Sequence, residues 1–153
     1  MPEPDSNARG TALVAAQLTL ITVLGLAAAP AFLRGQAPVL AWAAAVIGAV
    51  VGVWALASNR PGNFNIRPVP REGGRLIRSG PYRHIRHPMY TSVIACGLAC
   101  ALALGSAWSV LALLVLVGVL VAKASIEERA MARVHPDYAD YQAHTRRFVP
   151  GVY

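Results

Sequence analysis

Long apolar tracts alternate with charged segments along this chain. Three tracts contain no charged residue: 11–33, 38–57 and 88–122. A helix needs about 20 apolar residues to cross a hydrocarbon core of roughly 30 Å, so the first two tracts each predict one membrane span. The third tract is too long for one span and is interrupted at Gly105-Ser106, which predicts two helices. The pattern therefore predicts an all-α integral membrane protein, a single membrane domain over 1–153 with four transmembrane helices at about 11–33, 38–57, 88–104 and 107–125.

Composition favours lipid over a soluble helical bundle. Hydrophobic residues make up 56% of the chain and charged residues 14%, and the mean hydropathy is +0.47. A soluble helix would also need a polar face, which these tracts do not show. A cleaved signal peptide is the other alternative for the first tract. It is disfavoured because the residues before that tract include Glu3, Asp5 and only one cation, Arg9.

The basic residues indicate how the chain is oriented. The sequence has 14 Lys and Arg against 7 Asp and Glu, a formal net charge of +7, and most of these cations lie in 58–87 and after residue 122. Loops rich in Lys and Arg stay on the cytoplasmic side. We therefore expect a multi-pass protein of a bacterial inner membrane, with both termini cytoplasmic and its basic residues facing membrane lipids rather than nucleic acid.

Two features within the predicted spans concern packing. Gly48 and Gly52 form a G-x-x-x-G pair, which lets another helix approach closely, either inside the bundle or from a second protomer. Cys96 and Cys100 share one helix face in a geometry that disfavours a disulfide, so we interpret them as packing residues. The oligomeric state stays open.

The two cytoplasmic segments differ in character. The loop over 58–87 contains many Pro and Gly residues, so no long helix is expected there. A connection of this length without regular structure indicates a binding role, and we interpret it as a cofactor-binding loop. In the C-terminal segment 126–153 a polar helical continuation is interrupted at His135-Pro136. A second short helix with aromatic residues should follow, lying at the lipid interface.

Functional side chains concentrate at two places. The run 80–90, where the loop enters the third span, holds two His, two Arg and two Tyr, and Pro88 suits the first turn of the helix that follows. An interfacial anchoring belt is the alternative reading of this run. The second place is Glu127-Glu128, just past the fourth span, where the alternative is a surface ion pair with Lys123. The predicted topology puts both places at the same cytoplasmic depth.

These residues resemble a known family. The run Gly80-Pro81-Tyr82, the element Arg86-His87-Pro88-Met89-Tyr90, an apolar hairpin, Glu127-Glu128-Arg129 and then Tyr138 and Tyr141 resemble the isoprenylcysteine carboxyl methyltransferases and their phospholipid methyltransferase relatives. The resemblance covers about 76–150. It implies S-adenosylmethionine as the cofactor, held by Gly74, Arg75, Leu76, Ile77, Tyr82, His87, Pro88, Met89, Tyr90, Glu127 and Glu128. From the chemistry of their side chains, His84, Arg86, His87 and Lys123 are the candidates for catalytic roles beside this cofactor.

The chain departs from the family pattern at two points. Lys123 stands where the isoprenylcysteine enzymes have a substrate-facing arginine, and lysine cannot form the bidentate contact of a guanidinium. The tail between Glu128 and Tyr138 is about one residue shorter than usual. Which of Glu127 and Glu128 contacts the cofactor therefore stays open.

Several functions remain possible at this point. The methyl acceptor could be a lipophilic or lipid-linked carboxylate, a phospholipid amine or a small thiol. A thiol or an ammonium must lose a proton first, a role open to His84 or His87, whereas a carboxylate needs no base. A metal site using these histidines with His135 or His144 is disfavoured, because no supporting Cys or acidic ligand is suitably spaced. A membrane reductase using NADPH and a non-enzymatic membrane protein are the remaining alternatives.

Overall fold

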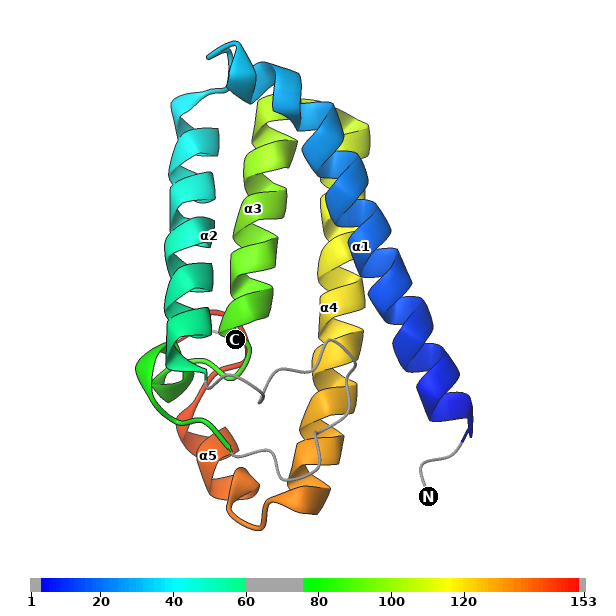
Figure 1. Ribbon diagram of the computed structural model, residues 1–153, viewed down its shortest axis with the longest axis vertical. Helices are drawn as coiled ribbons and strands as arrows, with labels where there is room; N and C mark the ends of the chain where they lie inside the picture. Colours follow the sequence, from blue (N-terminus) through cyan, green and yellow to red (C-terminus); the bar gives the residue numbers. More distant parts are fainter. Residues whose placement is uncertain (1–3, 60–75, 152–153) are drawn as a thin grey trace.

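Four long helices form an antiparallel bundle. A computed structural model describes residues 4–59 and 76–151, and within these residues it contains helices and one isolated parallel bridge but no strand. The long helices are α1 (Pro4–Leu33), α2 (Val39–Ser58), α3 (Pro88–Leu104) and α4 (Ala107–Val134) (Figure 1). The short helices η1 (Gly80–Arg83, a 3-10 turn) and α5 (Tyr138–His144) lie together at one end of the bundle (Figure 1).

Three of the four helices are long and apolar enough to cross a membrane by length and composition: α1 over Ala8–Leu33, α2, and α4. The apolar helix α3 has 17 residues, fewer than the about 20 that a span needs. Its length is set by Pro88 at its start and by Gly105 at its end, which adopts a left-handed conformation with φ of 56°. The apolar character expected of the helices is confirmed, and a fourth span at α3 stays a prediction.

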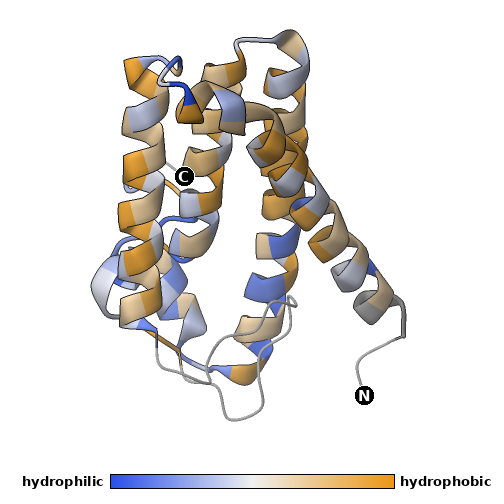
Figure 2. Ribbon diagram, turned by 45° about the horizontal axis from the view of Figure 1, so that its top comes forward, coloured by the Kyte–Doolittle hydropathy of each residue, from blue (hydrophilic) through white to orange (hydrophobic). Residues whose placement is uncertain are grey.

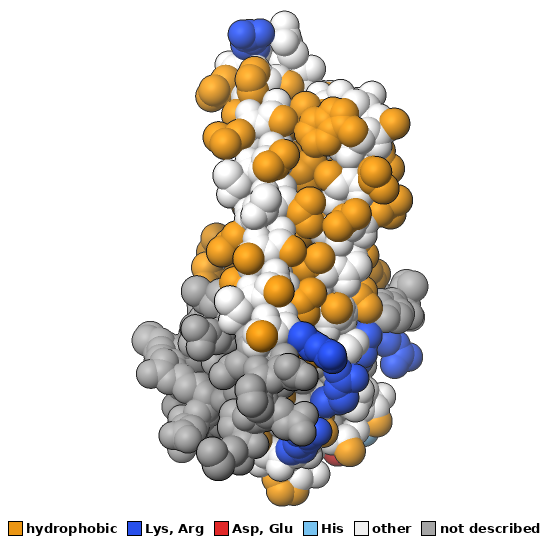
Figure 3. Space-filling model, turned by 90° about the vertical axis from the view of Figure 1, so that its right-hand side faces the viewer, with side chains coloured by type: hydrophobic (Ala, Val, Ile, Leu, Met, Phe, Trp, Pro, Cys, Tyr) orange, Lys and Arg blue, Asp and Glu red, His pale blue; other side chains and the backbone are white. Residues whose placement is uncertain are grey.

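The outside of the bundle is apolar along the helices. Most of the large hydrophobic residues of α2 are exposed, as a lipid-facing surface requires. On the face drawn in Figure 3, hydrophobic side chains extend over most of the length of the bundle, and Lys and Arg side chains gather near one end. Hydrophilic residues concentrate in the last turns of α4 and around α5 (Figure 2). The bundle therefore has an apolar body and one strongly polar end.

The G-x-x-x-G pair packs α2 against α3 within the chain. A Cβ atom added to Gly48 would lie 2.7 Å from the Cys96 sulfur, and one added to Gly52 would lie 2.7 Å from the Ser92 hydroxyl oxygen. The Ser92 hydroxyl also donates a hydrogen bond of 2.7 Å to the Gly48 carbonyl. Small residues and interhelical hydrogen bonds are the usual means of packing helices in lipid. Of the two expected roles for this pair, packing inside the bundle is the one the structure contains.

Helix boundaries follow local sequence signals. The helix α1 begins at Pro4 rather than near residue 11, because proline is well suited to a first helical turn. The helix α4 continues beyond residue 125 to Val134 and ends at His135, where the following Pro136 disfavours a helical backbone. Of the predicted loop 58–87, residues 60–75 lie outside the described residues.

Candidate functional site

The start of α3, the polar end of α4 and the C-terminal segment meet at one end of the bundle. Residues 84–87 pair through their backbones with residues 146–147: the Arg86 N–H donates to the Arg146 carbonyl at 2.7 Å, the His87 N–H to the Arg147 carbonyl at 3.1 Å, and the Arg146 N–H to the His84 carbonyl at 3.0 Å. The Thr91 hydroxyl donates to the Phe148 carbonyl at 2.7 Å. The tail is thereby fixed along the entrance to α3.

Close backbone approach positions the turn before α3. Gly80 adopts φ of 59°, and a Cβ atom at this position would lie 2.0 Å from the Ser58 hydroxyl oxygen at the end of α2. Only glycine fits both the left-handed backbone and this contact. The Tyr141 hydroxyl of α5 donates to the Tyr82 carbonyl at 2.7 Å, which ties the turn to the C-terminal segment.

Glu128 is the centre of the buried charge network. Its side chain is 6% exposed and accepts from Arg86 Nε at 2.8 Å and from an Arg147 terminal nitrogen at 2.6 Å, while His87 Nε2 lies 3.1 Å away. A buried carboxylate is tolerated when opposing charges and hydrogen bonds satisfy its lone pairs. Both Glu128 oxygens therefore have partners inside the protein.

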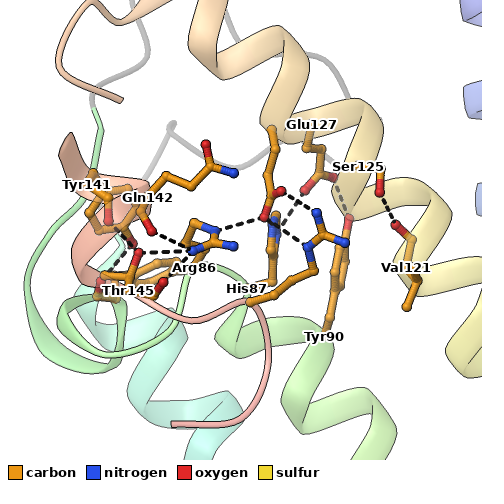
Figure 4. Close-up of polar contacts among 12 residues, drawn as sticks. Arg86, His87, Tyr90, Val121, Ser125, Glu127, Tyr141, Gln142 and Thr145 are labelled. Atoms are coloured by element: carbon orange, nitrogen blue, oxygen red, sulfur yellow. Dashed lines mark hydrogen bonds and ion pairs between the residues drawn. The ribbon is translucent and has the colours of Figure 1, made fainter. Parts of the chain in front are cut away.

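Arg86 also joins the polar end of α4 to the end of α5. Its terminal nitrogen donates to the Thr145 carbonyl at 2.5 Å and to the Gln142 carbonyl at 3.2 Å (Figure 4). The last carbonyls of a helix have no partner within the helix, and a cation there also complements the helix dipole. The guanidinium of Arg86 thus holds together three segments that are distant in sequence.

Glu127 lies in a different environment from Glu128. The Tyr90 hydroxyl donates to one of its oxygens, and His87 Nδ1 lies 3.3 Å from the other. Its side chain is 22% exposed, and none of the hydrogen bonds or ion pairs found for it within 4–59 and 76–151 involves an arginine. The Glu127 carboxylate can therefore still accept hydrogen bonds from a ligand, whereas the Glu128 carboxylate is enclosed by protein.

His87 lies between the two carboxylates. Its ring stacks on Tyr90 with centroids 5.3 Å apart and contacts Phe148 at 5.9 Å. Burial alone would lower the pKa of His87, but hydrogen bonds to Glu127 and Glu128 and their negative charge outweigh it, so the pKa is raised above its ordinary value. The ring is thus favoured in its protonated form, with both nitrogens available to donate.

Lys123 lies one helical turn before Glu127 on α4. It is 2% exposed, and its ammonium donates to the Gln17 side-chain oxygen of α1 at 2.5 Å. The same ammonium lies 5.0 Å from the centroid of the Tyr90 ring, a distance suited to a cation–π contact. A buried positive charge therefore lies against Tyr90, the residue whose hydroxyl donates to Glu127.

The chain matches a family model described as phospholipid methyltransferase over residues 36–138. The chain belongs to the phospholipid methyltransferase family. The family consists of integral membrane methyltransferases, so the resemblance found in the sequence is confirmed.

One curated relative is the cobalt-zinc-cadmium resistance protein CzcN of Cupriavidus metallidurans, which is 36% identical over 85 residues. The alignment covers 52% of this chain and 38% of CzcN, so the chain spans well under half of that relative's length. No solved structure matches the chain significantly.

Most residues that the family resemblance singled out lie around this site. His87, Tyr90, Glu127 and Glu128 contact one another as described, and Pro88 and Met89 continue the first turn of α3. Burial raises the pKa of Tyr82, and the negative charge of Glu127 raises it further. Of the other residues that the resemblance singled out, Leu76 and Ile77 are half-buried in the segment before η1, while Gly74 and Arg75 lie outside the described residues.

His84 is separated from this network. Its backbone pairs with Arg146, but its side chain is exposed and lines a hollow with Arg83, His144 and Arg146. Within residues 4–59 and 76–151, no group of three or more His, Cys, Asp or Glu side chains is arranged to hold a metal ion.

The phospholipid methyltransferase match excludes several residues that complete the site. Arg147, Thr145 and Phe148 follow residue 138, and Gln17 precedes residue 36. From the sequence, Arg147 is only one of the basic residues that set the topology, and Gln17 was not expected at the site. The one available signal for Gln17 was a polar residue inside an otherwise apolar span.

Proposed function

We propose that this chain is an S-adenosylmethionine-dependent methyltransferase that modifies a lipophilic acceptor at the cytoplasmic face of the membrane, as isoprenylcysteine carboxyl methyltransferases do. One observation carries the proposal: His87 and Tyr90, at the start of α3, both contact Glu127 near the end of α4. The chain also belongs to a family of membrane methyltransferases. An anchoring belt needs no such contact between a loop and a distant helix. In this proposal α3 is the fourth span, and the end that holds α5 faces the cytoplasm.

Glu127 is the carboxylate we assign to the cofactor. Its acceptor capacity is partly open to solvent, whereas the Glu128 oxygens are used by Arg86, Arg147 and His87. A carboxylate can accept from the ribose hydroxyls or the ammonium of S-adenosylmethionine. In this assignment Glu128 positions Arg86, Arg147 and His87 and does not itself bind the cofactor.

Aromatic residues complete the fit. When bound, S-adenosylmethionine supplies an electrophilic methyl group on a positively charged sulfonium. The rings of Tyr90 and Phe148, whose centroids lie 6.3 Å apart, form an aromatic wall beside His87 and Glu127, and the edge of such a wall can pack against adenine. Their further task is to exclude water from the reacting groups.

The state of His87 favours an acceptor that needs no base. Both ring nitrogens face carboxylates and the pKa is raised, so the protonated ring has no lone pair with which to take a proton from a thiol or an ammonium. A carboxylate acceptor is already ionised at neutral pH. The buried ammonium of Lys123 supplies a positive charge for such an anion. We assign no catalytic role to His84, whose ring is exposed elsewhere.

The test is binding and transfer with the purified full chain. We expect labelled S-adenosylmethionine to bind, and Glu127→Gln and His87→Asn each to weaken binding roughly tenfold or more, since each removes a charge-assisted contact. The matched control is Asp140→Asn, which removes an exposed carboxylate of α5 and should leave binding unchanged. Undiminished binding by both site variants, with unchanged thermal unfolding, rejects the site assignment.

The acceptor is identified by the fraction that receives the label. Membranes incubated with methyl-labelled S-adenosylmethionine are separated into prenylated peptide, phospholipid and small-thiol fractions. The proposal expects base-labile label, typical of a methyl ester, in a lipophilic fraction. Label in phospholipid amines is the second candidate, which the description of the matching family favours. Tight NADPH binding without S-adenosylmethionine binding would instead indicate a reductase.

A further inference from the structure

A small basic hollow lies outside the network around Glu127 and Glu128. It is open to solvent, has a volume of about 270 Å³ and is lined by Arg83, His84, Ala143, His144, Arg146, Pro150 and Gly151. This volume is slightly below the range of about 300 to 1,000 Å³ usual for sites that take whole small molecules. The hollow therefore suits a compact group rather than a nucleotide, and none of its lining residues is acidic.

The positive charge in this hollow is not neutralised by the protein. Arg86 and Arg147 in the neighbouring network pair with Glu128. By contrast, Arg83, His84 and Arg146 have exposed side chains with no hydrogen-bond or ion-pair partner among the described residues. His144 is the exception, since its Nδ1 lies 3.4 Å from Asp140. The hollow thus presents two arginines and a histidine to an incoming anion.

The backbone under these side chains is fixed. The Arg146 N–H donates to the His84 carbonyl at 3.0 Å, and the Arg146 carbonyl accepts from the Arg86 N–H at 2.7 Å. Arg83 ends the turn η1, whose first residue, Gly80, is packed against Ser58. A site whose backbone is already ordered loses less entropy when a ligand binds.

The hollow lies near the level where α2 leaves the apolar part of the bundle. The turn η1 packs against the end of α2, and Trp54 on the last turns of that helix is 47% exposed, as is usual for an aromatic residue at the membrane interface. Val149, next in sequence to the lining residue Pro150, also exposes 47% of its surface. A cationic hollow flanked by exposed apolar side chains matches a ligand that has a charged head and an apolar body.

We propose that this hollow binds the phosphate group of an anionic phospholipid in the surrounding leaflet. Guanidinium groups form strong, directional hydrogen bonds to phosphate oxygens. The cytoplasmic leaflet attracts cations through its negative surface potential. The site is separate from the one proposed for methyl transfer and anchors the turn before α3 to the membrane surface.

The test measures retained lipid on the full chain and does not depend on methyl transfer. Protein in detergent is mixed with phosphatidylglycerol or with phosphatidylcholine, and the bound lipid is counted by native mass spectrometry. We expect phosphatidylglycerol to be preferred, and the double variant Arg83→Gln/Arg146→Gln to weaken its binding on the order of tenfold or more. The charge-matched control is Arg129→Gln/Arg133→Gln on the exposed end of α4, which should change binding less than about twofold.

Three outcomes overturn the proposal. Equal losses in the two double variants would mean that lipid is attracted by net charge and not by this hollow. No loss in the Arg83→Gln/Arg146→Gln protein, with its folding verified by thermal unfolding, would mean that the hollow does not bind lipid. Inorganic phosphate that binds the hollow as tightly as phosphatidylglycerol would identify a soluble phosphate as the occupant.

Discussion

The ammonium of Lys123 lies 2.5 Å from the side-chain oxygen of Gln17, which joins the fourth long helix to the first. The Lys123 side chain is almost fully enclosed, and its other close neighbour is the face of Tyr90. Gln17 precedes the region matched by the phospholipid methyltransferase family. A helix without a family motif therefore supplies a direct hydrogen-bond partner to a charged residue beside the candidate site.

Replacing Gln17 by leucine should destabilise the protein. Gln17→Leu removes the oxygen that accepts from Lys123 and leaves a buried ammonium short of a partner, at a cost of about 1 to 3 kcal/mol. The free energy of unfolding in detergent is the measurement. Thr19→Val, at an exposed position of α1, is the control and should have little effect.

The double variant Gln17→Leu/Lys123→Met distinguishes a lost hydrogen bond from poor packing. Replacing both polar partners by apolar groups removes the unsatisfied charge, so the double variant should be more stable than Gln17→Leu alone. A double variant at least as unstable as the single one would show that leucine simply does not fit.

Adding one methyl group to Gly48 should separate α2 from α3. A Cβ atom there would meet the Cys96 sulfur at 2.7 Å and backbone atoms of α3 at 3.1 Å, so the helices must shift. We expect Gly48→Ala to lower the free energy of unfolding by about 1 to 3 kcal/mol. Gly118→Ala on α4 has no atom within 4 Å and should be neutral or stabilising, because alanine favours helix. Equal effects of the two substitutions would contradict the packing described.

Glu128→Gln should be more damaging to folding than any exposed carboxylate change. It leaves Arg86, Arg147 and protonated His87 without their shared anion in a buried setting, which costs about 3 to 5 kcal/mol. Asp137→Asn is the control, since its ion pair with Arg78 is exposed and is worth less than about 1 kcal/mol. Chemical unfolding of both variants gives the comparison, and a Glu128→Gln protein as stable as the control would contradict a central role for this carboxylate.

The contribution of His87 to stability should depend on pH. Because its pKa is raised in the folded protein, the contribution is full below the unfolded-state pKa of about 6.5 and is lost as the pH rises through the folded-state pKa. The gap in unfolding free energy between the native protein and His87→Asn should therefore be widest in acid and narrow towards alkaline pH. A gap that is constant or widens with pH would show that the carboxylates do not hold His87 protonated.

Local patterns predicted the helices and the two clusters of functional residues. Uncharged tracts and breakers such as Gly105 and Pro88 located all four long helices, because helix formation in lipid depends on contiguous apolar residues. The clustering of His, Arg and Tyr in the run 80–90 pointed to the entrance of α3. The predicted topology put His87 and Glu127 at the same depth, and in the structure His87 Nδ1 lies 3.3 Å from a Glu127 carboxylate oxygen.

Long-range pairing is what the sequence could not predict. The backbone bonds from Arg86 and His87 to the tail join positions about 60 residues apart, and nothing in the local pattern of either segment specifies that register. The different surroundings of Glu127 and Glu128 depend on the same pairing, because it brings Arg147 to Glu128. The exposure of His84 likewise follows from which side of the paired segment its ring occupies.

The pairing of residues 84–87 with 146–147 has a consequence for biosynthesis. A ribosome that has completed all the long helices has not yet made the strip of chain that holds the entrance to α3 in place. Until that strip is made, Glu128 lacks its ion pair with Arg147. The network around Glu128 is therefore completed only after all four long helices have been synthesised.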